Sequence, residues 1–305
     1  MALCDRLEAQ QQERVTRHAA LARASLATFA DAPTPANLNL IFHKSYTIPP
    51  ADLRKSILTL AVQGKLVPQD PQDEPAEVPS TAKRLRRFEP IAEKEIPFEL
   101  PRSWRWSRLG SEAEFINGDR GKNYPNKNEY VPTGVPFINT GHIQPGGTLS
   151  LTSMHYLTRA KYDSLRNGKV QKDDLVYCLR GATLGKTAII DQFIEGAVAS
   201  SLVIIRLGCN LTPRYTYYYL ISPLGRELIT RFDNGSAQPN LSANSVTRYV
   251  APVPPLAEQR RIVAKVDQLM ALVDQLEAQL AASRATAEKL MEAVVAELTS
   301  GAGAN

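Results

Sequence analysis

Two copies of one ten-residue motif lie near the two ends of the chain, and this internal repeat limits the folds that the chain can adopt. Residues 1–10 read MALCDRLEAQ, residues 270–279 read MALVDQLEAQ, and eight of the ten positions are identical. The segment from Pro254 to Asp267, before the second copy, has no counterpart before Met1, so we expect the first copy to be shortened at its start. The repeat predicts one helical element that is used twice, with an unlike module between the copies.

The second copy belongs to a long amphipathic segment. From residue 262 onward, apolar residues recur at alternating spacings of four and three, which is the heptad pattern of a coiled coil. Good helix formers fill the other positions, so we expect a helix over 262–298, roughly 55 Å long. Because such a helix cannot bury its stripe alone, we predict that the stripe contacts other subunits. The predicted interface residues are Ile262, Val266, Leu269, Val273, Leu276 and Leu280.

The segment up to about Ala30 has the same four-three spacing, so we expect a second long helix there, antiparallel to the first. Both could instead be ordinary packing helices of a bundle. The prolines between Asp31 and Pro50 predict that no helix forms in that interval, and a shorter helix is expected over 51–63.

Two further segments precede the middle of the chain. The stretch 68–79 is acidic and rich in proline, which is typical of a tether. The basic run 83–87 that follows is interpreted as a solvated helix face, with contact to phosphate as the alternative.

Positive charge gathers in the middle of the chain. Residues 101–250 contain 18 Lys and Arg against 11 Asp and Glu, whereas the whole chain has 36 against 31. A cationic surface favours a polyanionic partner, because bound phosphates release their condensed counterions. Short β-type runs at 135–138, 175–177, 188–190 and 202–205 predict a sheet here. One helix is expected from Pro213 to about Arg231, with its tyrosines in the core rather than stacked on bases.

Several classes of protein are excluded by what the sequence lacks. The three cysteines, Cys4, Cys178 and Cys209, form no C-x-x-C pair, so we expect small buried residues rather than disulfides or a zinc site. No histidine lies at metal-ligand spacing from another histidine or a cysteine. No apolar run reaches the length of a membrane span, and charges near the N-terminus argue against a signal peptide, so we expect a soluble cytoplasmic protein.

The segment 181–187 resembles a phosphate-binding loop, with three residues between its glycines where the Walker pattern has four. A strand-like run follows it instead of the helix that such a loop requires. We therefore interpret the segment as a hairpin that presents Arg180, Thr183 and Lys186 to DNA. No other catalytic constellation is present, and the chain is expected to perform no chemistry itself.

Several motifs together resemble the specificity subunit of type I restriction-modification systems. They are the run Leu53–Asp70, the segments Phe98–Pro101 and Trp104–Trp106, Phe137–Gly141, Gly235–Ser242 and Pro254–Gln259. Members of this family alternate two target recognition domains with two conserved helical regions. This chain has one recognition domain, so it resembles the C-terminal half of a full subunit.

The resemblance implies an α+β fold, with one mixed α/β target recognition domain flanked by two long antiparallel coiled-coil helices. The expected domains are a first long helix (1–30), a connecting region with a short helix and linker (31–97), the recognition domain (98–252) and a second long helix (253–305). The implied partners are double-stranded DNA, methyltransferase subunits that carry S-adenosylmethionine, and a restriction subunit that uses ATP and Mg. The chain itself is expected to bind no cofactor, and two half-subunits could form a homodimer.

The loops expected to read DNA are 118–127, 139–147, 180–186 and 235–244. Asparagine and glutamine suit adenine edges and arginine suits guanine, each bidentate contact being worth about 1–3 kcal/mol of discrimination. The predicted contact residues are Lys122, Asn123, Asn139, Thr140, Arg180, Thr183, Lys186, Gln238 and Asn240. For the two asparagines at 139 and 240, a turn-forming role is an equally good interpretation. Two alternative functions stay open. The chain could be a purely structural coiled-coil scaffold, or a nucleotide-dependent enzyme that uses 181–187.

Overall fold

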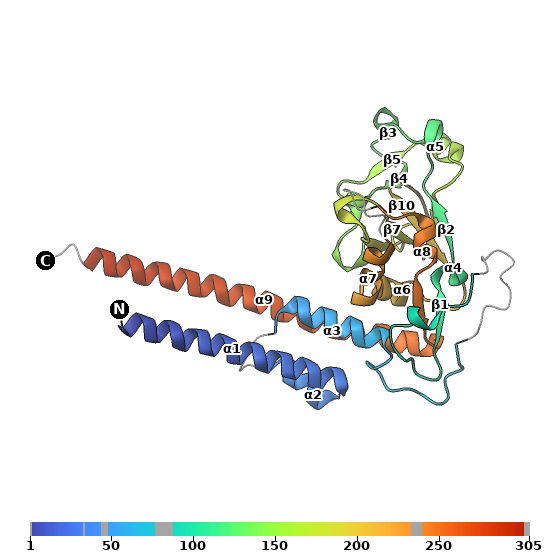
Figure 1. Cartoon of the computed structure of the whole chain (residues 1–305). Helices are drawn as coiled ribbons and strands as arrows, with labels where there is room; N and C mark the ends of the chain where they lie inside the picture. Colours follow the sequence, from blue (N-terminus) through green and yellow to red (C-terminus); the bar gives the residue numbers. More distant parts are fainter. Residues whose placement is uncertain (1, 33, 44–47, 77–87, 233–239, 302–305) are drawn as a thin grey trace. The chain divides into compact units, whose positions relative to one another are not determined.

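The computed structural model describes residues 2–32, 34–43, 48–76, 88–232 and 240–301. The chain forms two compact units (Figure 1). The helical unit contains Met1–Ile57 and Ala264–Asn305, and the sheet unit contains Leu58–Val263. The predicted boundaries of the recognition domain, 98 and 252, fall inside the sheet unit and stay predictions.

The helical unit is built from four helices. They are α1 (Ala2–Asp31), α2 (Pro35–Ile41), the first part of α3 (Pro50–Val62) and most of α9 (Leu256–Gly301). In Figure 1, α1 and α9 run in opposite directions, and the two chain ends lie at the same end of the unit. The two long helices and the shorter helix at 51–63 are therefore confirmed.

Helix α2 was not expected, because we predicted that the prolines would break any helix between residues 31 and 50. Pro35 occupies the first turn instead, where its missing N–H would have had no helical partner. Thr34 caps the helix, since its side-chain oxygen accepts a hydrogen bond from the N–H of Asn37. Here a proline starts a helix rather than preventing one.

The sheet unit holds three sheets. A two-stranded antiparallel sheet pairs β1 (Arg105–Arg108) with β11 (Val250–Val253). A four-stranded antiparallel sheet has the order β2-β10-β7-β8, from Ala113–Asn117, Leu202–Leu207, Leu175–Cys178 and Thr187–Ile189. A five-stranded mixed sheet has the order β3-β5-β4-β9-β6, from Tyr130–Val131, His155–Leu157, Val135–Ile138, Glu195–Val198 and Lys169–Gln171. All four predicted strand runs are present as β4, β7, β8 and β10.

The core of this unit lies between the two larger sheets. Side chains from both meet in one cluster, which includes Ile138 and Val198 from one sheet and Val176 and Ile204 from the other. A second cluster covers the opposite face of the five-stranded sheet and contains Tyr162 from α5 (Arg159–Ser164). Strands that are apolar on both faces are thus buried on both faces, and the polar loops between them remain at the surface.

The helix predicted from Pro213 to Arg231 is two helices, α6 (Pro213–Ile221) and α7 (Pro223–Phe232). Ser222 is extended between them, because the residue before a proline is driven out of the helical region. Its side-chain oxygen accepts a hydrogen bond from the N–H of Gly225 and so caps α7. The expected burial is confirmed, since Tyr215, Tyr218, Tyr219, Leu220 and Leu228 are all at most 4% exposed.

The hydroxyl groups of two of these tyrosines explain why they lie in the core. Tyr215 donates to the carbonyl oxygen of Pro252, and Tyr219 donates to that of Val250, at 3.0 and 3.1 Å. Both rings therefore anchor α6 to β11, and neither is available to stack on a base.

Two smaller expectations were wrong. The acidic stretch after Pro68 is no free tether in its described part, since the N–H of Ala76 donates to the carbonyl oxygen of Ser103 and Asp73 pairs with Arg261. Cys209 is exposed, whereas Cys178 is buried as predicted.

The basic run 83–87 lies outside the described residues. Among the helices that are described, none combines the length and hydropathy that a membrane span requires.

Candidate nucleic-acid interface

The hairpin between β7 and β8 is one of the cationic loops that we predicted from the sequence. Gly181 and Gly185 both have positive φ, near 75°, and they turn the chain on either side of a single 3-10 turn. Arg180 and Lys186 are exposed at the two ends of this turn. Thr183 is half-buried, and its hydroxyl lies 3.3 Å from the Cys178 sulfur. The hairpin therefore presents the two cations, while Thr183 holds the turn against β7.

The strand β8 begins at Thr187, directly after this turn. A phosphate-binding loop hands its phosphate to the N-terminus of a following helix, and no helix follows here. The structure thus supports our interpretation of 181–187 as a hairpin rather than a nucleotide site.

Helix α7 contacts the hairpin and holds its turn. The guanidinium of Arg226 donates to the carbonyl oxygen of Leu184 at 3.2 Å. A Cβ at Gly185 would lie 2.4 Å from Cδ1 of Ile229, and the φ of +76° at this position also favours glycine. Arg226 is a positioning residue that sequence analysis missed, because nothing in the sequence places 226 beside 184.

A segment far along the chain lies beside the hairpin. Arg180 and Asn240 form an isolated antiparallel bridge, and the N–H of Leu241 donates to the carbonyl oxygen of Leu179 at 2.9 Å. Two of the predicted contact residues are therefore neighbours on one surface. Gln238 lies outside the described residues.

The loop after β4 contains Asn139 and Thr140, which are both half-exposed. The Asn139 side-chain oxygen accepts a hydrogen bond from the N–H of Gly141 at 2.8 Å. This is the turn-forming role that we held open for Asn139.

Buried His142 fixes the same loop. Its Nδ1 accepts from the N–H of Asn139 at 3.1 Å, and its Nε2 lies 3.0 Å from the carbonyl oxygen of Ser153. One ring nitrogen must accept and the other must donate, so the neutral ring fits this environment. Burial lowers the pKa of His142, and the nearby His155 ring acts in the same direction. His142 thus belongs to the frame of the loop.

Lys122 and Asn123 form a 3-10 turn after β2, with Lys122 exposed and Asn123 half-exposed. Together with Arg166, which follows α5, they line a hollow of about 400 Å³. The structure therefore adds a second cationic loop beside the predicted one.

Three of the motifs that carry the family resemblance, 53–70, 104–106 and 254–259, meet in one buried network. Glu258 is 0% exposed, and its two carboxylate oxygens accept from Trp104 at 2.8 Å and Gln69 at 2.6 Å. Burial raises the pKa of Glu258, and these two hydrogen bonds oppose that change. The next residue, Gln259, donates to the carbonyl oxygen of Pro254 and accepts from the N–H of Thr212. These motifs join the start of α9 to β1 and to the segment after α3.

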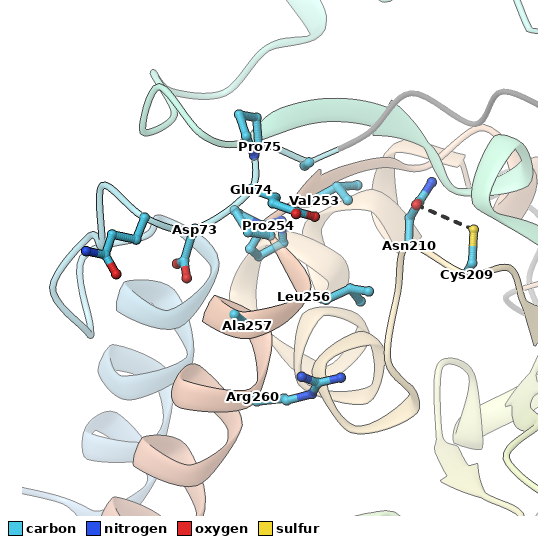
Figure 2. A pocket seen from close by; sticks show the side chains of 13 residues that line it. Asp73, Glu74, Pro75, Cys209, Asn210, Val253, Pro254, Leu256, Ala257 and Arg260 are labelled. Atoms are coloured by element: carbon cyan, nitrogen blue, oxygen red, sulfur yellow. Dashed lines mark hydrogen bonds between the residues drawn. The ribbon is translucent and has the colours of Figure 1, made fainter.

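A further hollow, of about 490 Å³, lies at this network (Figure 2). Figure 2 shows it between the 73–75 segment, the start of α9 and the Cys209–Asn210 turn. The carboxylates of Asp73 and Glu74 line it, and a hydrogen bond from Arg261 lowers the pKa of Asp73. Two carboxylates at its wall make this hollow a poor site for DNA.

The predicted interface stripe on α9 divides into two parts. Ile262, Val266, Leu269 and Val273 are each 0% exposed in the single chain, and Leu276 and Leu280 are half-buried. Within the helical unit, α3 lies along α9, and Arg54 pairs with both Asp274 and Glu277 at 2.6 Å. The four buried residues expose no surface in the single chain, and their predicted contact with other subunits stays a prediction. The chain itself covers the stripe.

The apolar residues farther along α9 remain uncovered. Leu290, Met291, Val294 and Val295 are between 47% and 68% exposed. Among the described residues, no group of three His, Cys, Asp or Glu side chains could hold a metal ion.

Comparison with known proteins agrees with these features. The family model described as "Type I restriction modification DNA specificity domain" matches residues 101–283, which is more than half of the chain. The specificity subunit of the type I restriction enzyme EcoAI of Escherichia coli is 27% identical over 96% of this chain and 54% of its own length. That of EcoEI, also from Escherichia coli, is 29% identical over 81% of this chain and 43% of its own length.

A chain from a solved structure described as "Structural basis underlying complex assembly and conformational transition of the type I R-M system" has a similar fold, with a TM-score of 0.51. It is 23% identical and covers 79% of this chain and 51% of its own length. The chain thus spans about half the length of the relatives that it matches. Because the family model covers most of the sheet unit and the start of α9, the chain belongs to the family of type I restriction-modification DNA specificity domains.

Proposed function

We propose that the sheet unit reads one half of a split DNA target and that the chain acts as the specificity subunit of a type I restriction-modification complex. The observation that carries this proposal is the match of the DNA specificity domain to residues 101–283, which include the cationic hairpin and its neighbour Asn240. Arg180 would donate to a guanine edge, and Lys186 would contact the DNA backbone.

The chain would perform no chemistry itself. Methyltransferase subunits with bound S-adenosylmethionine would modify the DNA, and a restriction subunit with ATP and Mg would cleave it.

The helical unit would hold the methyltransferase. Since the stripe from Ile262 to Val273 is buried by the chain itself, the docking surface would be the exposed apolar residues of α9. These residues are Leu290, Met291, Val294 and Val295. Leu276 and Leu280, which are half-buried, would border that surface.

Two copies of the chain, related by a twofold axis, would bring two identical reading surfaces to DNA. A symmetric dimer reads a symmetric site, so the target would be an interrupted palindrome. The single specificity-domain match within this chain motivates this proposal.

The test is co-expression of the chain with its methyltransferase, followed by methylome sequencing. Adenine methylation at one interrupted palindrome is the expected result. An asymmetric bipartite motif would exclude the homodimer while retaining DNA specificity. Absence of any sequence-specific methylation, with the complex shown to assemble, would contradict the proposed function itself.

A further inference from the structure

We propose that the hollow beside Lys122 binds a phosphate of the DNA backbone. This inference rests on the proposed function, because it assigns a second contact point to the same DNA-reading unit. The hollow, of about 400 Å³, lies between the loop after β2 and the turn after α5. Its lining includes three basic side chains, Arg120, Lys122 and Arg166.

Two glycines allow the two loops to touch. Gly168 has a φ of +76°, and a Cβ there would lie 2.7 Å from the Cα of Gly118. A Cβ on Gly118 would lie 2.6 Å from the carbonyl oxygen of Ala199. Only glycine fits at both positions, so the two backbones are held in direct contact.

One carboxylate then joins the loops. Asp119 is 7% exposed, and its two oxygens accept from the N–H of Arg120 and from the N–H of Arg166, each at 2.7 Å. Both arginines therefore project from backbone positions that one buried side chain fixes. Because the backbone of both loops is already ordered, anion binding has to order only the ends of the side chains.

The three cations are exposed, and none of them forms an ion pair or a side-chain hydrogen bond within the described part of the chain. Other arginines of the sheet unit are paired, as Arg105 is with Glu112 and Arg206 is with Asp174. Three cations without a partner thus converge at one hollow, where the only carboxylate already accepts hydrogen bonds at both oxygens.

The chemistry of the lining favours phosphate over a base edge. Guanidinium and ammonium groups donate hydrogen bonds and accept none, and a phosphate diester offers oxygens that only accept. Base edges present donors as well as acceptors, and the three basic side chains at the hollow can pair only with acceptors. The asparagines that also line it, Asn117, Asn123 and Asn167, can donate to phosphate oxygens as well. The charged groups of the site would therefore position the duplex through its backbone.

The test compares two double variants of the full chain on a duplex of unrelated sequence. Binding is followed by fluorescence anisotropy over a series of salt concentrations. For Arg120→Gln with Arg166→Gln, we expect weaker binding to every duplex and a slope of log K against log salt that is smaller by about 0.9 for the lost phosphate. The control, Lys65→Gln with Arg102→Gln, removes the same charge from exposed residues outside the hollow and should keep the slope of the wild type. Equal slopes for the two double variants would overturn the proposal.

A third variant tests whether Asp119 affects DNA binding by holding the two loops in position or by its negative charge. Asp119→Asn makes the chain more positive, and long-range electrostatics alone would then tighten DNA binding. An asparagine side chain has a single acceptor oxygen, so one of the two loop contacts is lost. We expect weaker binding and a smaller salt slope, with a cooperative thermal transition retained. Tighter binding would overturn the role of Asp119 as a positioning residue for the site.

The source of the phosphate can be tested in the same proteins. Inorganic phosphate, titrated into the wild-type chain at constant ionic strength, should show no saturable binding at micromolar concentrations. Saturable binding that the Arg120 and Arg166 changes abolish, together with an unchanged DNA slope, would reveal a free-phosphate site and overturn the proposal. If the wild type bound no duplex at all, the proposed function would fail as well. If the wild type binds the duplex and the Arg120→Gln, Arg166→Gln variant has the same salt slope as the wild type, the phosphate site is excluded and the proposed function is not.

Discussion

The network around Glu258 and the hairpin around Arg180 lie in the same unit and differ in almost every respect. Glu258 is fully buried and accepts hydrogen bonds from Trp104 and Gln69, residues that belong to separate family motifs. Arg180 is exposed, and its neighbours in the loop are glycine, alanine and threonine. The first region contains motifs of the family, and the second contains none of them.

Three of the family motifs, those that contain Gln69, Trp104 and Glu258, thus form a buried network, whereas the hairpin around Arg180 lies outside the motifs. Buried polar groups need specific partners, because an unpaired group in the interior costs about 1–3 kcal/mol. Glu258 and Gln259 meet that requirement with hydrogen bonds to four segments of the chain. A loop exposed to solvent has no such requirement, so its residues can differ between targets without loss of the fold.

The largest effect is expected in the frame. Trp104→Ala removes a buried ring and the donor to Glu258, so we expect a loss of about 3–5 kcal/mol in the free energy of unfolding. Urea denaturation measures it, with Arg180→Ala as the control that should leave the midpoint unchanged. A loss below about 1 kcal/mol would mean that the network does not support the unit.

The difference between buried and exposed positions can also be tested along α9. Leu269→Glu places a carboxylate at a position that is 0% exposed, so we expect a loss of several kcal/mol in stability. Leu290→Glu changes a side chain that is 65% exposed and should leave stability within about 0.5 kcal/mol while abolishing co-purification with methyltransferase. Retained co-purification of Leu290→Glu at wild-type stoichiometry would exclude the distal face as the docking surface.

A smaller effect, on sequence discrimination, is expected at the hairpin. Arg180→Ala should reduce the preference for the specific target by about 1–3 kcal/mol, because a bidentate base contact is lost. Lys186→Ala should weaken binding to all duplexes similarly and lower the salt slope by about one. Competition between specific and unrelated duplexes separates the two. If both variants kept wild-type affinity and slope, the hairpin would lie outside the interface.

The smallest effect concerns pH. The pKa of His142 is lowered in the folded chain, so its contribution to stability is complete above about pH 6.5 and is lost as pH falls below that value. A protonated ring has no acceptor for the N–H of Asn139. We expect the free energy of unfolding to fall less between pH 7 and 5 in His142→Gln than in the wild type. Identical pH profiles would show that the titration of His142 does not affect the loop.

Local patterns predicted much of the fold. The heptad stripe, the short helix at 51–63 and the four β-type runs are all present, because spacing along the chain decides which face of an element is apolar. The break at Ser222 was missed, although Pro223 signals it, because the tyrosines suggested one continuous buried face. The whole α9 stripe was assigned to an interface with another subunit because the sequence does not show that four of its residues are buried within the single chain.

The sequence by itself determined the family, the two long helices, four of the strands and the cationic character of the middle module, since these depend on residue types and short-range spacing. Tertiary structure alone decided which loops meet. Asn240 lies beside Arg180, Arg226 supports Leu184, and Asp119 joins two loops that are 47 positions apart along the chain. Such contacts follow from how the sheets pack and where two glycines allow backbones to touch, and no local pattern encodes that geometry.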